Sequence, residues 1–125
     1  MEIKIAKIFF VGVESKLLKE FKKLPLEAVD SLEQADILFV GKDFDEDLVD
    51  YLSLGVVPVL PEKYGFIDYN PVMEIGDAFN YTAESEISAV YALSRAIENH
   101  KFIYDWKSIQ SNFNTRLKLT KKTLV

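Results

Sequence analysis

Three short apolar runs, each ended by a residue that interrupts regular structure, constrain the fold of this chain most strongly. They are IKIAKIFFV at residues 3–11, DILFV at 36–40 and VVPVL at 56–60. Runs of this length that are rich in Val, Ile and Phe are typical of strands buried on both faces of a sheet. Because proline cannot donate to a strand ladder, Pro58 predicts that the strand at 56–60 lies at an edge or contains a bulge. The side chains predicted to fill the core from these strands are Ile8, Phe10, Ile37, Phe39, Val57 and Val59.

Segments with a helical period separate the apolar runs. One helix is predicted ahead of Pro25, another over about residues 84–99, and a third from Asp105, its predicted N-cap. A short acidic helix is predicted over 45–54, with Gly55 just past its end. The side chains expected on the buried faces are Leu17, Leu18, Phe21 and Leu24 in the first helix, Ile87, Val90, Tyr91 and Ile97 in the second, and Trp106, Ile109, Phe113 and Leu117 in the last.

Two further minimal strands, at 26–29 and 78–81, raise the expected number to five, and residues 61–76 are predicted to form a long loop. Strands that alternate with helices imply β-α-β units with right-handed crossovers, and hence a parallel sheet covered by helices on both faces. The sequence therefore predicts the α/β class. We expect a single Rossmann-like or flavodoxin-like three-layer domain over residues 1–118, followed by a basic C-terminal tail at 119–125.

The composition narrows the chemistry and the compartment. The chain has no cysteine, which excludes disulfides, thiolate metal sites and a cysteine nucleophile. No stretch approaches the roughly 20 apolar residues that a membrane helix needs, so no membrane span is expected. The first residues alternate charged with apolar side chains and lack the continuous apolar run of a signal peptide. We therefore expect a cytoplasmic protein.

Charge is distributed unevenly along the chain, although the net charge is only −5. Residues 1–100 contain nine Lys/Arg and nineteen Asp/Glu, a balance of −10, whereas residues 101–125 contain six and one, a balance of +5. The acidic body argues against a nucleic-acid partner, which would need a basic face. The basic end is either a solvated helix end or a contact for an anionic partner.

The loop and strand over residues 61–81 contain more aromatic side chains than such short elements need. Together with the uneven charge, these rings predict a homo-oligomer or another protein partner, because exposed aromatic residues bordered by charge are typical of interfaces. The alternative is that the rings fold back over the open end of the sheet and complete the core. The residues concerned are Tyr64, Phe66, Tyr69, Phe79 and Tyr81.

Open parallel sheets bind ligands at the carboxyl ends of their strands, where the strand order reverses. Any site is therefore expected in the segments 11–15, 41–46 and 61–76. No catalytic residue, metal ligand or cofactor is predicted, because the chain contains no complete catalytic, phosphate-loop or dinucleotide motif. The candidate ligand-binding residues are Gly12, Glu14, Lys42, Asp43 and Tyr64.

Carboxylates are densest around the predicted acidic helix. Asp43, Asp45 and Asp47 have the opening spacing of a calcium loop. However, Leu48 and Leu54 stand where that loop needs Gly and Glu, so calcium binding in that form is excluded. We interpret the cluster as carboxylates that satisfy a helix start. Weak divalent-ion binding and an acidic contact patch are the alternatives.

A phospho-receiver domain shares the predicted fold and length, and its site can be compared with this chain directly. Such a domain places a phosphorylated Asp at the end of the third strand and a Lys after the fifth. Here Gly41 stands at the first position and the stretch 80–82, NYT, at the second. Only Asp43, two residues later, could substitute as the acceptor. A degenerate receiver-like signalling domain is therefore a distant alternative.

Four stretches between residues 36 and 113 resemble segments of one enzyme family. DILFV at 36–40 is similar to the strand before an acidic donor loop, and DLVDYLSLGVVPVL at 47–60 is similar to the segment EAMA-x-G-x-PVV. GDAFNY at 76–81, with the helix at 84–98, is similar to the stretch GNAF…AL-x-RAL. YDWKSI at 104–109 is similar to a terminal helix that contains Trp. In these stretches the chain resembles the C-terminal Rossmann-like half of the GT-B glycosyltransferases, especially glycogen- and starch-synthase-like members.

The resemblance implies a Rossmann-like fold and a nucleotide sugar as the ligand. The family grips the sugar and diphosphate with a Glu-bearing loop that contains Gly, whereas this chain has the shorter KDFDED at 42–47, in which Lys42 would contact a phosphate. We therefore expect a stand-alone glycosyltransferase-like domain that acts as a non-catalytic binding or assembly module, without activity as an isolated chain. The alternative is the sugar-nucleotide-binding half of a two-chain glycosyltransferase.

Overall fold

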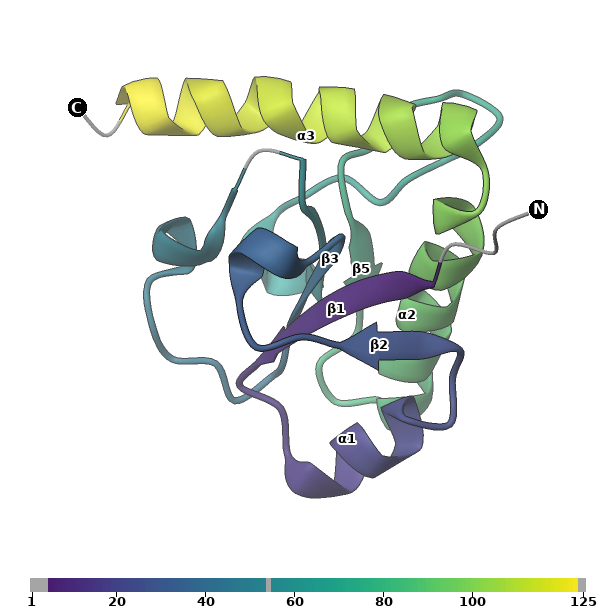
Figure 1. Cartoon of the computed structure of the whole chain (residues 1–125). Helices are drawn as coiled ribbons and strands as arrows, with labels where there is room; N and C mark the ends of the chain where they lie inside the picture. The colour runs from purple at the N-terminus through teal and green to yellow at the C-terminus, as the bar shows by residue number, and fades with distance from the viewer. Residues whose placement is uncertain (1–4, 54, 124–125) are drawn as a thin grey trace.

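The computed structural model describes residues 5–53 and 55–123, with side chains up to Leu119. Five parallel strands form one sheet in the order β2-β1-β3-β4-β5 (Figure 1). The predicted α/β class and five-stranded parallel sheet are confirmed. The strands are β1 (Ala6–Val11), β2 (Leu26–Ala28), β3 (Ile37–Val40), β4 (Val57–Pro61) and β5 (Phe79–Tyr81). The helices are α1 (Ser15–Phe21), α2 (Glu86–His100) and α3 (Ile103–Thr123), with the 3-10 helices η1 (Leu32–Gln34), η2 (Leu48–Tyr51) and η3 (Glu62–Tyr64).

The strand order identifies where this sheet should bind a ligand. β1 lies between β2 and β3. The chain therefore adds β2 on one side of β1 and then crosses over to add β3, β4 and β5 on the other side. This is the flavodoxin-like order, whose reversal lies between β1 and β3. The carboxyl ends of these two strands therefore mark the expected site.

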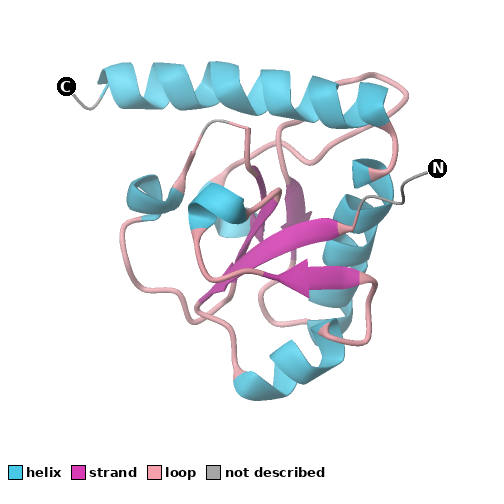
Figure 2. Cartoon of the chain, in the orientation of Figure 1, coloured by secondary structure: helices cyan, strands magenta, loops and turns pink. Residues whose placement is uncertain are grey.

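Helices and loops cover both faces of the sheet and divide the core into two clusters (Figure 2). Alternate strand residues point to opposite faces, so neighbours such as Leu38 and Phe39 belong to different clusters. The first cluster packs the sheet against α1 and α2, and the second packs it against the later part of α3. The first contains Ile8, Ile37, Phe39, Val57, Val59 and Phe79, and the second contains Leu38, Val40, Leu60, Ala78, Phe113 and Leu117.

The buried face of α2 differs from the predicted one. Ile97 is buried, but Ile87 and Tyr91 are 84% and 65% exposed, and Val90 is only partly buried. A stripe of small residues faces the sheet instead, because alanine lets a helix approach a strand closely. The observed buried face shares only Ile97 with the predicted one and consists of Ala89, Ala92, Leu93, Ala96 and Ile97.

The last helix confirms its predicted stripe but not its predicted start. It begins at Ile103, so Asp105 lies in its first turn and accepts a hydrogen bond from the Tyr69 hydroxyl at 2.7 Å. The helix continues to Thr123, across the start of the predicted tail. None of the helices in the described part of the chain is long and apolar enough to cross a membrane. The buried stripe consists of Trp106, Ile109, Phe113 and Leu117.

The acidic helix predicted over 45–54 is wrong. The structure has only the single turn η2, whose N-cap Asp47 accepts a hydrogen bond at 3.1 Å from a backbone amide two residues on. A longer helix would place Glu46 and Asp50 four residues apart, and like charges at that spacing are destabilising. Leu54, the end of the predicted helix, lies outside the described residues.

The edge position predicted from Pro58 is wrong for the strand as a whole, because β4 lies between β3 and β5. Pro58 pairs with Leu38 of β3, but the ladder with β5 begins one residue later, where Val59 pairs with Phe79. At Pro58 itself the strand therefore has a neighbour on one side only. A residue without a backbone N–H is tolerated at such a position.

The aromatic side chains of residues 61–81 complete the core, so this basis for an interface is wrong. Tyr69, Phe79 and Tyr81 are buried, and Tyr64 and Phe66 are half-buried against the second cluster. The segment is held to the helices by the hydrogen bond from the Tyr69 hydroxyl to Asp105 and by the ion pair between Arg95 and Asp68. The predicted loop thus lies against the sheet.

Phe39 lies at the centre of the first cluster. Its ring centroid is 4.7 Å from that of Phe21 and 5.4 Å from that of Tyr81, and its side chain is fully buried. Phe39→Ala should therefore destabilise the protein by about 3–5 kcal/mol through the cavity that it leaves. Chemical denaturation measures this loss, with the exposed Phe102→Ala as the control. A loss below about 1 kcal/mol would contradict this core assignment.

Candidate functional site

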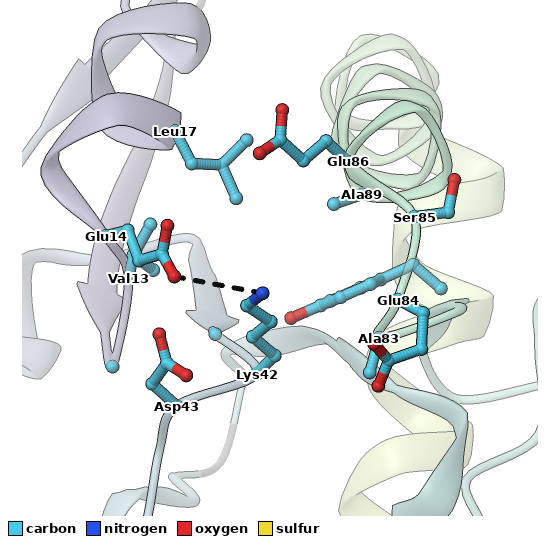
Figure 3. Close-up of a pocket in the computed structure, with 13 residues that line it drawn as sticks. Val13, Glu14, Leu17, Lys42, Asp43, Ala83, Glu84, Ser85, Glu86 and Ala89 are labelled. Atoms are coloured by element: carbon cyan, nitrogen blue, oxygen red, sulfur yellow. Dashed lines mark ion pairs between the residues drawn. The ribbon is translucent and has the colours of Figure 1, made fainter.

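A pocket of about 100 Å³ lies at the carboxyl end of the sheet, beside the reversal point between β1 and β3. Three segments form it: the turn between β1 and α1, the residues that follow β3, and the connection from β5 to α2 (Figure 3). The pocket therefore lies where parallel sheets of this topology bind ligands. Its side chains include those of Glu14, Leu17, Lys42, Asp43, Tyr81 and Glu86.

Two glycines allow the first two segments to meet. Gly12 has φ +65°, and a Cβ on it would lie 2.7 Å from backbone atoms of Phe44. A Cβ on Gly41 would overlap the carbonyl oxygen of Gly12. The glycines thus serve the close approach of two backbone turns, as expected for residues without a Cβ.

The charges in the pocket favour a cation. One ammonium group, that of Lys42, stands against the carboxylates of Glu14, Asp43, Glu84 and Glu86, a balance of +1 − 4 = −3. The Lys42 Nζ lies 3.8 Å from the nearer Glu14 oxygen (Figure 3). Both side chains are about half exposed, so this pair adds little stability. A phosphate group would meet net repulsion here, whereas a basic group would be attracted.

Tyr81 closes the inner wall of the pocket. Its ring stacks on Phe39, and its hydroxyl donates a hydrogen bond at 2.5 Å to the carbonyl oxygen of Val40. Burial is the main reason that the pKa of Tyr81 is raised above its ordinary value, and the nearby Tyr64 and Asp43 raise it further. The hydroxyl is therefore a neutral donor that is already engaged with the backbone.

The structure brings four of the five predicted site residues together. Gly12, Glu14, Lys42 and Asp43 all line the pocket. Tyr64 does not: it lies in η3, half-buried against the second core cluster, with the Lys63 Nζ 5.2 Å from its ring centroid. Segments 11–15 and 41–46 thus contribute as predicted, and the segment 61–76 does not line the pocket.

Sequence reasoning missed the third wall, which is formed by Tyr81, residues 83–86 and Ala89. The signal was available, because the rule about strand ends applies to the residues directly after the fifth predicted strand. Ser85 also marks the start of a helix: its hydroxyl oxygen accepts a hydrogen bond from the amide of Ser88 at 3.1 Å. In the described residues, no group of three His, Asp or Glu side chains could hold a metal ion.

A wider groove continues from the pocket between α1 and α2, with a volume of about 460 Å³. Leu17 and Glu86 line both hollows, and they lie close together at one end of the pocket (Figure 3). The groove is mainly apolar, and it includes the two exposed residues of α2 that the sequence had placed in the core. Its lining consists of Lys16, Leu17, Glu20, Glu86, Ile87, Val90, Tyr91 and Ser94.

Comparison of the chain with protein-family models, with curated proteins and with solved structures gave no match. The resemblance to glycosyltransferases therefore stays a prediction. The geometry of the pocket and the groove is the basis for inferring a function.

Alkaline pH should weaken the fold through Tyr81. The unfolded chain ionises this residue near pH 10, whereas the native state keeps it protonated to higher pH. The native state then holds a proton that the unfolded state has lost, so stability falls as the pH rises past about 10, by up to ~1.4 kcal/mol per pH unit. Denaturant unfolding of Tyr81→Phe should show a shallower loss than wild type, with Tyr104→Phe as the control. Equal slopes for wild type and Tyr81→Phe would contradict the buried, protonated hydroxyl.

Proposed function

We propose that this chain is a non-catalytic binding module that holds a protein partner across the acidic pocket and the adjoining groove. The continuity of the two hollows through Leu17 and Glu86 is the observation that carries this proposal. It presents an apolar surface and a charged recess side by side, at the end of the sheet where this topology favours ligands. A cytoplasmic location and a glycosyltransferase-like ancestry accompany the proposal as predictions from the sequence.

The groove suits an amphipathic helix. Ile87 and Tyr91 are four residues apart on α2, so they lie one above the other on a single face, and both are exposed. Large apolar side chains that are exposed next to charge are typical of interaction surfaces. A partner helix with apolar residues every three or four positions would cover them. A lysine or arginine at its edge would then reach the carboxylates of the pocket.

A nucleotide sugar fits this site less well. Its diphosphate would approach four carboxylates with only Lys42 as a counter-charge. No observation of the site favours that ligand over a basic partner, so the two-chain glycosyltransferase remains an expectation from the resemblance. The receiver-like alternative depends on Asp43, and labelling with an acyl phosphate would test it.

A lysine-bearing amphipathic peptide should bind, and a matched peptide with Glu for Lys should bind at least about tenfold more weakly. Fluorescence anisotropy measures both affinities. Tyr91→Ser should weaken the lysine peptide by a similar factor because it removes apolar surface from the groove. Val72→Ser provides the matched control, since Val72 is exposed and outside the groove.

Two results would overturn the proposed function. One is equal binding of both peptides to wild type and to Tyr91→Ser, which would place the contact elsewhere. The other is a rise in melting temperature with a nucleotide sugar, together with its turnover by the pure protein and loss of turnover in Lys42→Ala.

A further inference from the structure

We propose that the partner is a second copy of this chain, which inserts the C-terminal end of its α3 into the groove and pocket. This inference rests on the proposed function and names its partner. Three observations support it: the opposite charges of the two surfaces, the position of the α3 end, and the distance of that end from the groove of its own molecule.

Charge complementarity is the first observation. After Asp105 the chain contains no further acidic residue, whereas four basic residues follow Phe113: Arg116, Lys118, Lys121 and Lys122. Arg116 is paired with the buried carboxylate of Asp77. The other three basic residues of this stretch, Lys118, Lys121 and Lys122, give the sequence of the helix end a charge of +3. The pocket has a balance of −3. The charges of the pocket and of the helix end are therefore opposite in sign and equal in magnitude.

The end of α3 is the second observation. Leu117 is the last buried residue of the stripe that packs on the sheet, and Leu119 is 62% exposed. The helical backbone nevertheless continues to Thr123 and extends past the sheet (Figure 1). This helix end thus combines an exposed leucine with lysines on both sides of it in the sequence. That combination is what the groove and pocket are suited to bind.

The third observation is that the end of α3 lies far from the groove of its own molecule, so the contact must form between two molecules. α3 and α1 lie at opposite ends of the molecule, so the end of α3 cannot reach the groove beside α1 in the same chain (Figure 1). Because the contact joins two different surfaces, it is heterologous. Copies would associate head to tail, as a ring where the rotation closes and as an open chain where it does not.

Sedimentation velocity of the full chain tests this arrangement. Wild type should form species larger than a monomer at micromolar concentration, and they should dissociate as salt is raised, because salt screens the lysine–carboxylate attraction. The double variant Asp43→Lys/Glu84→Lys reverses charge in the pocket, and Lys121→Glu/Lys122→Glu reverses charge on the helix end. Each variant alone should associate at least about tenfold more weakly than wild type.

An experiment that mixes the two variants is the decisive test. In the mixture, the unchanged helix end of the first variant meets the unchanged pocket of the second, and the two reversed surfaces also attract each other. Association should therefore return. Thermal unfolding of each variant shows that it is folded before it is used.

The proposal is overturned if wild type is a monomer at every concentration and salt, if both variants associate like wild type, or if the mixture stays monomeric. A monomeric wild type that still binds the lysine peptide would refute the second copy as partner and leave the binding module intact. A monomer that binds neither peptide would refute both.

Discussion

The contact between the turn after β1 and the end of β3 determines how this edge of the sheet is built. Gly41 lies against the carbonyl of Gly12, and the turn at Gly12 lies against the backbone of Phe44. A side chain at either glycine would force these segments apart. Because they stay together, Glu14, Lys42 and Asp43 converge beside the strand-order reversal. The position of the acidic pocket is thus a consequence of backbone packing.

The sequence was most informative where a pattern had one physical cause. The runs at 36–40 and 56–60 became neighbouring buried strands, and the stripe of α3 from Trp106 to Leu117 is buried as predicted. The predicted buried face of α2 was wrong because the size of the side chains received more weight than their helical period. The sequence predicts a core position for the large residues Ile87 and Tyr91, although the alanine stripe of α2 fits the sheet more closely. That error concealed the apolar groove.

The candidate site was predictable only where the sequence pattern marks the end of a strand clearly. Two of its three walls follow β1 and β3, each of which is followed directly by a glycine, and the rule about strand ends located them. The third wall follows β5, which has only three residues, so the sequence pattern favours the long loop at 61–76 over the end of this strand. The groove that adjoins the pocket depends on how α1 packs against α2. The sequence pattern of each helix by itself does not reveal that packing. The aromatic residues of 61–81 likewise could be assigned to core or surface only in three dimensions.

The central claim is that the pocket and the α1–α2 groove form one binding surface. Backbone amide chemical shifts, recorded by NMR over a dilution series of the full chain, test it most directly. We expect concentration-dependent shifts around Leu17, Ile87 and Tyr91, together with shifts at Leu119 near the end of α3. Shifts confined to the exposed apolar residues Val72, Met73 and Ile75, with the groove unchanged at every concentration, would contradict it.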